Sequence, residues 1–418
     1  MQLAKVLMSV VFSLLLGSFF VCLPAFADQS VISYLLTDSA SSTNVLEKVI
    51  KASDLSLPGN WSIEKRVLQG GRQDGVDIIA VNNGRLTFTI VPTRGMSIWD
   101  VRCKETRVGW DAPVKEIVHP KYVNLLLDDG AGWRHGWGAW LPRCGIRWFG
   151  PPGKDEVTGE FITQHGLIDY LPASRVEVMV DTHPPYTLTV KGCIAEARLY
   201  RPTLELVSEF STEPDSLQFT IKDKIVNRGG VDAECGMLYH ANYGHPFLAQ
   251  GSRLVAPFAR ITPQAKGGFP ESAPEEIVAF REPRAGYKRQ VWYAKLNSDG
   301  NGLTKLLLRN EEGNLGVSYA YSLDQLPYLT LWKNLVALED GYVAGVEPGT
   351  GYGANHRNIE RKNGHYPPLK PGESRDLRIT FEVAVGADRV SQIEQEIRAI
   401  QGSKKTIYDK DWVEGISY

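Results

Sequence analysis

The stretch Leu377-Arg378-Ile379-Thr380-Phe381-Glu382-Val383-Ala384-Val385 decides the fold class, because large apolar residues occupy every second position of it. Successive side chains of a β-strand point to opposite faces, so this period of two is typical of an antiparallel strand with one buried face. The same alternation appears at residues 86–90, 176–180 and 217–221. Clusters of Gly, Pro and Asn separate these runs, and no regular alternation with helices accompanies them. We therefore expect an all-β fold, a large antiparallel sandwich.

Short helices are expected to flank the strands. The first covers residues 45–52, with its apolar residues on one side and Thr43 as its cap. The second follows the capping residue Asp388, repeats apolar residues at spacings of three and four, and stops at Gly402. We expect this second helix to pack on the edge of the sandwich.

The chain between the helices indicates one strand-rich domain. It contains no internal repeat, no low-complexity tract and no linker rich in Pro, Ser or Gly that would divide it. The expected domain covers residues 75–386. It lies between an N-terminal extension at residues 28–74 and a C-terminal helix and tail at residues 387–418.

The N-terminus has the three parts of a secretory signal peptide. A basic residue precedes the apolar run 6–23, and small residues stand at Ala25 and Ala27, where a signal peptidase cleaves. We expect residues 1–27 to be removed and the mature chain to be periplasmic or secreted. An uncleaved membrane anchor is the alternative, because the run has almost the length that spans a bilayer.

The charge of the chain excludes some classes of partner. The 418 residues include 46 Lys and Arg against 48 Asp and Glu, a net charge of −2. This balance gives no electrostatic reason to expect nucleic acid or an acidic membrane surface. A small or neutral ligand is the expected partner, and no membrane contact is expected after signal cleavage.

Four cysteines remain after the signal segment: Cys103, Cys144, Cys193 and Cys235. In an oxidising compartment they allow one or two disulfides, and three pairings of the four are open. No spacing of Cys and His is typical of a zinc site, so we expect no metal ion. We also expect no cofactor.

A tryptophan-rich segment is a candidate for sugar binding. Half of the ten tryptophans lie between Trp110 and Trp148, and glycines flank several of them. Trp133, Trp137 and Trp140 are expected on a loop, where an indole offers a flat apolar face and an N–H donor to a sugar ring. The alternative is that these rings fill the core of the sandwich.

Titratable residues recur where expected strands run into turns rich in Gly or Pro. His165, His240 and Glu347 have this position, and they would meet if the turns lie at one end of the sandwich. Catalysis of ring opening in a cyclic sugar needs a base at the anomeric hydroxyl and an acid at the ring oxygen, which a carboxylate and an imidazolium supply. Each residue alone is more often structural.

These segments together resemble the galactose mutarotase (aldose 1-epimerase) superfamily. The resemblance rests on the order of an Arg-bearing loop, a His-Gly step at His165, a strand-end His240 and the pair Glu347-Pro348. It is greatest to the DUF4432 family, whose Pro-x-Arg-Gly-Met and Leu-x-x-Cys-Gly patterns occur at residues 92–96 and 141–145. The resemblance spans about residues 86–385.

The resemblance implies a β-supersandwich that binds a monosaccharide or small carbohydrate in a groove on one sheet. By position, Glu347 is similar to the base that takes the anomeric proton, and His240 to the acid at the ring oxygen. His165 and Arg143 are similar to the residues that hold the hydroxyls. Further substrate contacts are expected from three residues near these segments: Asn242, His245 and Asn355.

The leading hypothesis is a cofactor-free isomerase of the mutarotase type. The alternatives are a carbohydrate-binding protein without catalysis and a glycoside lyase or hydrolase, since one fold can carry several chemistries. For the isomerase we expect Glu347 and His240 to face each other across the width of a pyranose ring, with His165 on the wall. Opposite charges so close would lower the pKa of the Glu and raise that of the His.

Overall fold

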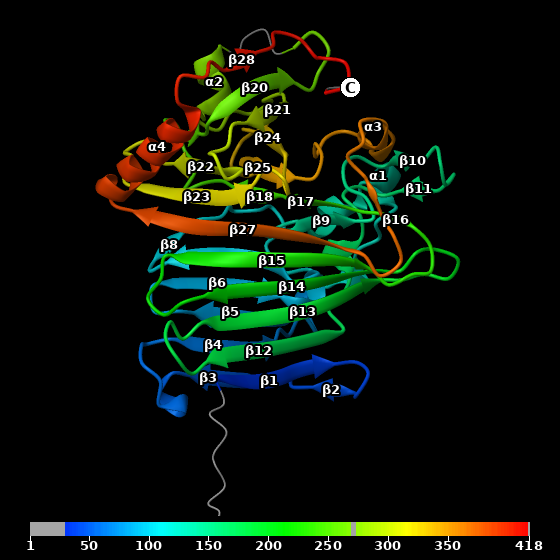
Figure 1. Ribbon diagram of the computed structural model, residues 1–418, viewed down its shortest axis with the longest axis vertical. Coiled ribbons are helices and arrows are strands. Elements are labelled where there is room, and N and C mark those ends of the chain that lie inside the picture. The colour runs from blue at the N-terminus through cyan, green and yellow to red at the C-terminus, as the bar shows by residue number, and fades with distance from the viewer. Residues whose placement is uncertain (1–29, 269–272, 417–418) are drawn as a thin grey trace, which may run out of the picture.

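Strands dominate the computed structural model, which describes residues 30–268 and 273–416 (Figure 1). Nearly all strand pairs are antiparallel, which confirms the expected all-β class. The largest sheet has ten strands. In spatial order they are β19 (Arg253–Val255), β22 (Leu303–Arg309), β23 (Leu315–Ser322), β27 (Ser374–Val385), β15 (Gln218–Asn227), β14 (Leu204–Thr212), β13 (Leu188–Glu196), β12 (Arg175–Asp181), β1 (Val31–Asp38) and β2 (Thr43–Asn44).

Two smaller sheets cover one face of the ten-stranded sheet, and Figure 1 shows β4, β5 and β6 behind β12 to β15. The six-stranded sheet consists of β3 (Lys48–Lys51), β4 (Ser62–Val67), β5 (Asp77–Asn82), β6 (Leu86–Val91), β7 (Ser97–Cys103) and β8 (Thr106–Arg107). The eight-stranded sheet consists of β28 (Ile407–Tyr408), β20 (Phe258–Pro263), β21 (Gln290–Leu296), β24 (Tyr328–Asn334), β25 (Val343–Gly349), β17 (Gly236–Tyr239) and β9 (Arg143–Ile146), with β18 (Ala241–Tyr243) also paired to β25.

The remaining elements are short. Two-stranded sheets are formed by β10 (Gly153–Lys154) with β11 (Phe161–Ile162) and by β16 (Ala233–Glu234) with β26 (Pro368–Leu369). The helices are α1 (Leu127–Gly130), α2 (Pro274–Val278), α3 (Arg357–Lys362) and α4 (Ala387–Gln401).

Aromatic side chains fill the core between the layers. Phe88 from the six-stranded sheet stacks on Phe219 of the ten-stranded sheet with ring centroids 4.8 Å apart, and Trp140 meets Phe381 of the same sheet at 5.1 Å. An isolated bridge between Ile98 and Leu141 links β7 to the segment before β9. The two smaller sheets therefore form one continuous layer at this point.

The strand predictions are confirmed. The alternating runs lie in β6, β12, β15 and β27, where the apolar residues face the core except Val385, which is 45% exposed. The C-terminal helix is confirmed as α4, which packs against β22, β23 and β27. Its cap is Gly386 rather than Asp388, which lies in the first turn.

The helix expected at residues 45–52 is wrong, because this segment contains strand β3. Ile50 is buried and pairs with Ile63 of β4, whereas Val49 is 46% exposed. An apolar run this short fits both periods, and pairing with β4 decides between them. The strands β1, β3 and β4, which precede residue 75, thus belong to the same sheets as the rest.

The expected signal peptide, residues 1–27, lies outside the described residues. Among the described residues, no helix combines the length and the apolar character that crossing a bilayer requires. The four cysteines expected in the mature chain are free, and three of them are buried.

Candidate active site

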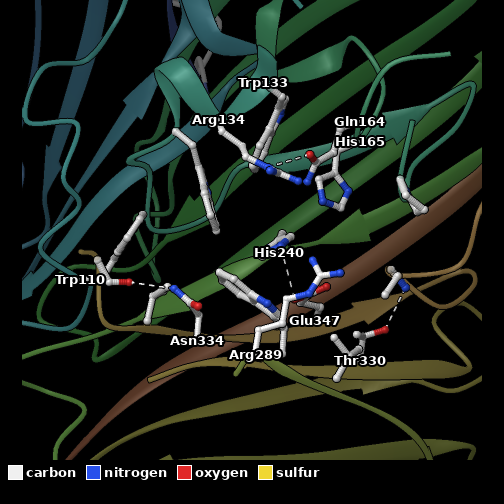
Figure 2. Close-up of a pocket in the computed structure, with 18 of the residues that line it drawn as sticks. Trp110, Trp133, Arg134, Gln164, His165, His240, Arg289, Thr330, Asn334 and Glu347 are labelled. Atoms are coloured by element: carbon white, nitrogen blue, oxygen red, sulfur yellow. Dashed lines mark hydrogen bonds and ion pairs between the residues drawn. The ribbon is translucent and has the colours of Figure 1, made fainter. Parts of the chain in front are cut away.

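Glu347, His240 and His165 line one cavity of about 450 Å³ (Figure 2). Glu347 lies on β25, and His240 lies at the break between β17 and β18, both of which pair with β25. His165 comes from the loop before β12, and its Nδ1 accepts a hydrogen bond from the backbone N–H of Gly150. The predicted meeting of these three residues is thus observed.

The cavity has apolar walls with polar groups set among them. The remaining lining residues are Trp110, Pro113, Val114, Trp133, Arg134, Trp137, Pro151, Pro152, Gln164, Gln264, Arg289, Val291, Thr330, Trp332, Asn334, Asp340, Gly341, Val343, Gly353 and Ala354. A cavity of this size with indole walls and a few convergent polar groups suits a monosaccharide.

Strand register places Glu347 in the cavity. Thr330 of β24 is the direct partner of Glu347, and Trp332 is the direct partner of Gly345. Directly opposite residues of antiparallel strands share a face, so these side chains point to the same side of the sheet. A Cβ at Gly345 would overlap Oε1 of Glu347 and lie 3.1 Å from Cε1 of His240. Glycine at this position therefore makes room for the acidic group and the imidazole together.

His240 and Glu347 are in direct contact. Nε2 of His240 lies 3.3 Å from Oε1 of Glu347, and both side chains are almost fully buried. The expected gap of one ring width between them is absent. Direct contact of the two groups is still compatible with acid–base catalysis of ring opening, because the anomeric and ring oxygens of a sugar are bonded to the same carbon. An acid and a base that serve both oxygens can lie side by side.

Burial determines the protonation of the pair. Removal from water raises the pKa of Glu347 well above its usual value and lowers the pKa of His240 to about 4. The expectation of a lowered Glu pKa and a raised His pKa is therefore wrong, because desolvation is the largest cause of both shifts. Burial thus favours the uncharged form of each side chain, a protonated Glu347 and a neutral His240.

Aromatic rings enclose His240 and exclude water from it. The ring centroids of Trp137 and Trp332 lie 5.5 and 5.8 Å from that of His240, and His165 lies 5.3 Å away. The pKa of His165 is also lowered well below its usual value. Burial is the largest cause, and the electrostatic effects of His240 and Arg134 are smaller causes. The imidazole of His165 is thus neutral near pH 7, and it can bind a hydroxyl without adding charge to the site.

Two indole donors are unpartnered in this region. The Nε1 atoms of Trp133 and Trp137 are buried and have no hydrogen-bond partner, and their rings lie 5.0 Å apart. A buried N–H without a partner costs free energy, so these groups have reason to bind a ligand oxygen. The prediction that the tryptophan-rich segment borders the site holds for these two residues.

Trp140 and Arg143, also predicted to contact the sugar, lie elsewhere. Trp140 is fully buried in the core between the sheets, so the core-filling alternative is correct for this ring. Arg143 is fully buried too, and it donates hydrogen bonds to the carbonyls of Gly95 and Met96. Neither side chain lines the cavity.

The three weaker candidates do not line the cavity either. Asn242 donates a hydrogen bond to the carbonyl of Ala139, and His245 is exposed to solvent. Asn355 accepts from the hydroxyl of Tyr293 and donates to Glu360. Asn355 thus supports the turn that follows Glu347 and does not line the cavity.

Sequence reasoning missed several lining residues. Thr330 and Trp332 lie two residues apart on β24, so they share a face of the strand. Pairing of β24 with β25, the strand of Glu347, places both side chains at the cavity. Arg134 and Arg289 are exposed residues in segments that carry no periodic pattern. Only the folded chain brings these two residues to the cavity.

The Pro-x-Arg-Gly-Met segment supports the loops around the cavity. Arg94 forms a buried ion pair with Asp169, and its Nη1 donates to the carbonyls of Val118 and Gly136. The hydroxyl of Tyr170 donates to the carbonyl of Trp133. Arg94 and Asp169, which we call the buried clamp, thus join the loop of Trp133 to the loop of His165.

A metal site is not evident. Among the described residues, no group of three or more His, Cys, Asp or Glu side chains could hold a metal ion.

Comparison with known proteins identifies relatives of the chain. The model of a domain of unknown function, DUF4432, matches residues 73–383. A crystal structure from Klebsiella pneumoniae subsp. pneumoniae, described as a candidate aldose 1-epimerase, is 32% identical over 91% of this chain and 98% of that chain, with a TM-score of 0.87. No curated protein matches the sequence.

More distant structures share the fold. A galactose mutarotase-like protein from Clostridium acetobutylicum is 13% identical over 77% of this chain and 98% of that chain, with a TM-score of 0.53. A galactose mutarotase related enzyme from Lactobacillus acidophilus is 13% identical over 74% of this chain and 98% of that chain, with a TM-score of 0.50. At this identity the likeness concerns the fold alone.

Proposed function

Because this chain belongs to the DUF4432 family and has a galactose mutarotase-like fold, we propose that it is a cofactor-free aldose 1-epimerase-like isomerase. Its substrate would be a free sugar whose two anomers it interconverts. The observation that carries this proposal is the buried contact of His240 with Glu347 on the wall of a cavity lined by tryptophan. A carboxyl group and an imidazole in this setting form a proton-transfer pair.

In the proposed reaction, Glu347 takes the proton of the anomeric hydroxyl, O1–H. The bond between C1 and the ring oxygen O5 breaks, its electron pair goes to O5, and His240 protonates O5. The products are the open-chain aldehyde, a protonated Glu347 and a neutral His240. Rotation about the C1–C2 bond and closure by the reverse steps give the other anomer and return both protons.

The resting protonation of the pair fits this cycle. Ring opening starts from a carboxylate and an imidazolium, whereas burial favours the neutral forms. Both states contain one proton, and Oε1 and Nε2 lie 3.3 Å apart, although Oε1 makes no hydrogen bond in the free protein. The neutral state is also the state that ring opening produces. The cycle therefore passes through both states without exchange of protons with solvent.

The pH dependence of turnover tests this assignment. A second proton on His240, or loss of the proton from Glu347, should stop the reaction, so the profile should be bell-shaped. The acid limb should lie near pH 4, because burial lowers the pKa of His240 to about 4. Anomer exchange followed by NMR, corrected for the spontaneous rate, measures the profile. An acid limb at or above the ordinary His pKa of about 6.5 would contradict the assignment.

Methyl glycosides separate the isomerase from a hydrolase or lyase on the same fold. A methyl glycoside has no anomeric O–H, so the proposed pair should leave it unchanged while it exchanges the anomers of the free sugar. Cleavage of the glycoside would support the hydrolase or lyase. Binding of the free sugar without any exchange would support a carbohydrate-binding protein.

We also propose that the protein is exported, on the basis of the N-terminal apolar run and the residues Ala25 and Ala27. Cleavage after Ala27 should give a mature chain that begins at Asp28. N-terminal sequencing of the protein from the periplasm or the medium measures this. Material that retains Met1 in a membrane fraction would indicate an anchor instead.

A further inference from the structure

Two arginines line the cavity without an acidic partner. Arg134 and Arg289 are both exposed, and Figure 2 shows their side chains reaching into the cavity from opposite sides. Nε of Arg134 donates to Oε1 of Gln164 at 3.1 Å, which orients the group and leaves its Nη atoms free. Arg289 makes no hydrogen bond or ion pair with the described residues.

The carboxyl groups of the cavity do not neutralise these cations. Glu347 and Asp340 are its acidic lining residues, and neither lies within 4.0 Å of a guanidinium of Arg134 or Arg289. Burial raises the pKa of Glu347 well above its usual value, so burial disfavours a negative charge on this group. The two arginines therefore line the cavity as cations that neither of its carboxyl groups contacts.

Several other arginines of the chain have acidic partners. Arg198 and Arg201 both pair with Glu160, and Arg228 pairs with Glu205. Arg134 and Arg289 have no such acidic partner, and they lie in the same cavity. A neutral sugar needs hydroxyl-binding groups, and it does not need two unpaired cations.

We propose that the sugar carries an anionic group, a carboxylate or a phosphate, and that Arg134 and Arg289 bind it. This inference rests on the proposed function, because it takes Glu347 and His240 as the site of the anomeric carbon. Those residues are buried and the arginines are exposed, so the charged group would lie at the solvent end of the sugar. The planar fork of a guanidinium matches a carboxylate or a phosphate with two parallel hydrogen bonds.

The test compares sugars that differ only at C6. Glucose, glucuronate and glucose 6-phosphate form one series, and the corresponding galactose compounds form a second. Dissociation constants are measured by calorimetry for the wild type, Arg134→Gln, Arg289→Gln and Lys288→Gln. Lys288 is the matched control, because it is exposed, adjacent to Arg289 and outside the cavity lining.

In at least one series we expect an anionic sugar to bind about tenfold or more tightly than its neutral counterpart, as a charge-assisted hydrogen bond provides. Arg134→Gln and Arg289→Gln should each reduce this preference, and Lys288→Gln should retain it. Preference for the uronate would identify a carboxylate, and preference for the phosphate ester would identify a phosphate. Equal binding, or no binding, of anionic and neutral sugars in both series would overturn the inference, as would an equal loss in Lys288→Gln.

Anomer exchange on the same samples separates this inference from the proposed function. Anion preference without exchange would refute the isomerase and leave the arginine site intact. Exchange of neutral sugars, with no anion preference and no effect of the arginine variants, would support the isomerase and refute the arginine site.

Discussion

Glu347→Gln is expected to slow anomer exchange by about 10²- to 10⁴-fold, the usual contribution of a general acid or base. Glutamine has the same size and can still bind a hydroxyl, so sugar affinity should change far less than the rate. His240→Asn should have a similar effect. The double variant should be scarcely slower than either single variant, because the two residues move one proton as a unit.

The stability of Glu347→Gln provides the control for folding. The folded-state pKa of Glu347 is raised above its unfolded value, so its contribution to stability is present at low pH and is lost as pH rises through the folded pKa. Glutamine does not titrate, and Oε1 of Glu347 has no hydrogen-bond partner to lose. Near neutral pH the variant should therefore melt at the wild-type temperature or above it, although it has lost activity.

Glu360→Gln is the matched comparison for a buried acidic group with a structural role. Glu360 accepts hydrogen bonds from the backbone N–H of Tyr352 and from Nδ2 of Asn355, and it contacts His365 at 2.7 Å. Replacement of Glu360 by Gln should lower the melting temperature.

For the proposed mechanism, the decisive measurement is the turnover of Glu347→Gln. Unchanged turnover on the sugar that binds best would refute the mechanism.

The fold follows from the sequence because alternation encodes the buried face of a strand. In β27 the period of two is visible from Leu377 to Val383. The strands β6, β12 and β15 show the same alternation. The segment 45–52 was misread because its few apolar residues fit either period. Only its pairing with β4 makes it a strand.

The site was predicted in part, and the errors concern which face a side chain takes. Arg143 is the direct partner of Tyr239 across β9 and β17, and the hydroxyl of Tyr239 bonds to the buried Asp223. Both side chains thus point into the core, whereas His240, the next residue, points into the cavity. A sequence resemblance places Arg143 near the site but does not give its face.

The protonation of Glu347 and His240 could not be predicted from the sequence either. Neighbouring opposite charges suggest one direction of pKa shift, and burial gives the other. The extent of burial depends on rings from distant segments, Trp137 and Trp332, that close over His240. No local pattern reports that enclosure.

The buried clamp should be more costly to break than surface ion pairs of the chain. The side chains of Arg94 and Asp169 are 3% and 2% exposed. Ser97 donates a further hydrogen bond to Oδ1 of Asp169 at 2.6 Å. Once buried, such a pair is costly to break, because removal of one partner leaves the other charged and without water. The same pair also fixes the loops of Trp133 and His165, so its loss should disturb the cavity.

Asp169→Asn is therefore expected to lower the free energy of unfolding by about 3–5 kcal/mol, measured by urea denaturation. Replacement of both partners, Arg94→Met with Asp169→Leu, should cost less than the sum of the single changes, because no unpaired charge remains. The control is Glu116→Gln, which breaks an exposed pair with Arg72 and should have little effect. If Asp169→Asn instead proves as mild as Glu116→Gln, the clamp does not hold the loops around the cavity.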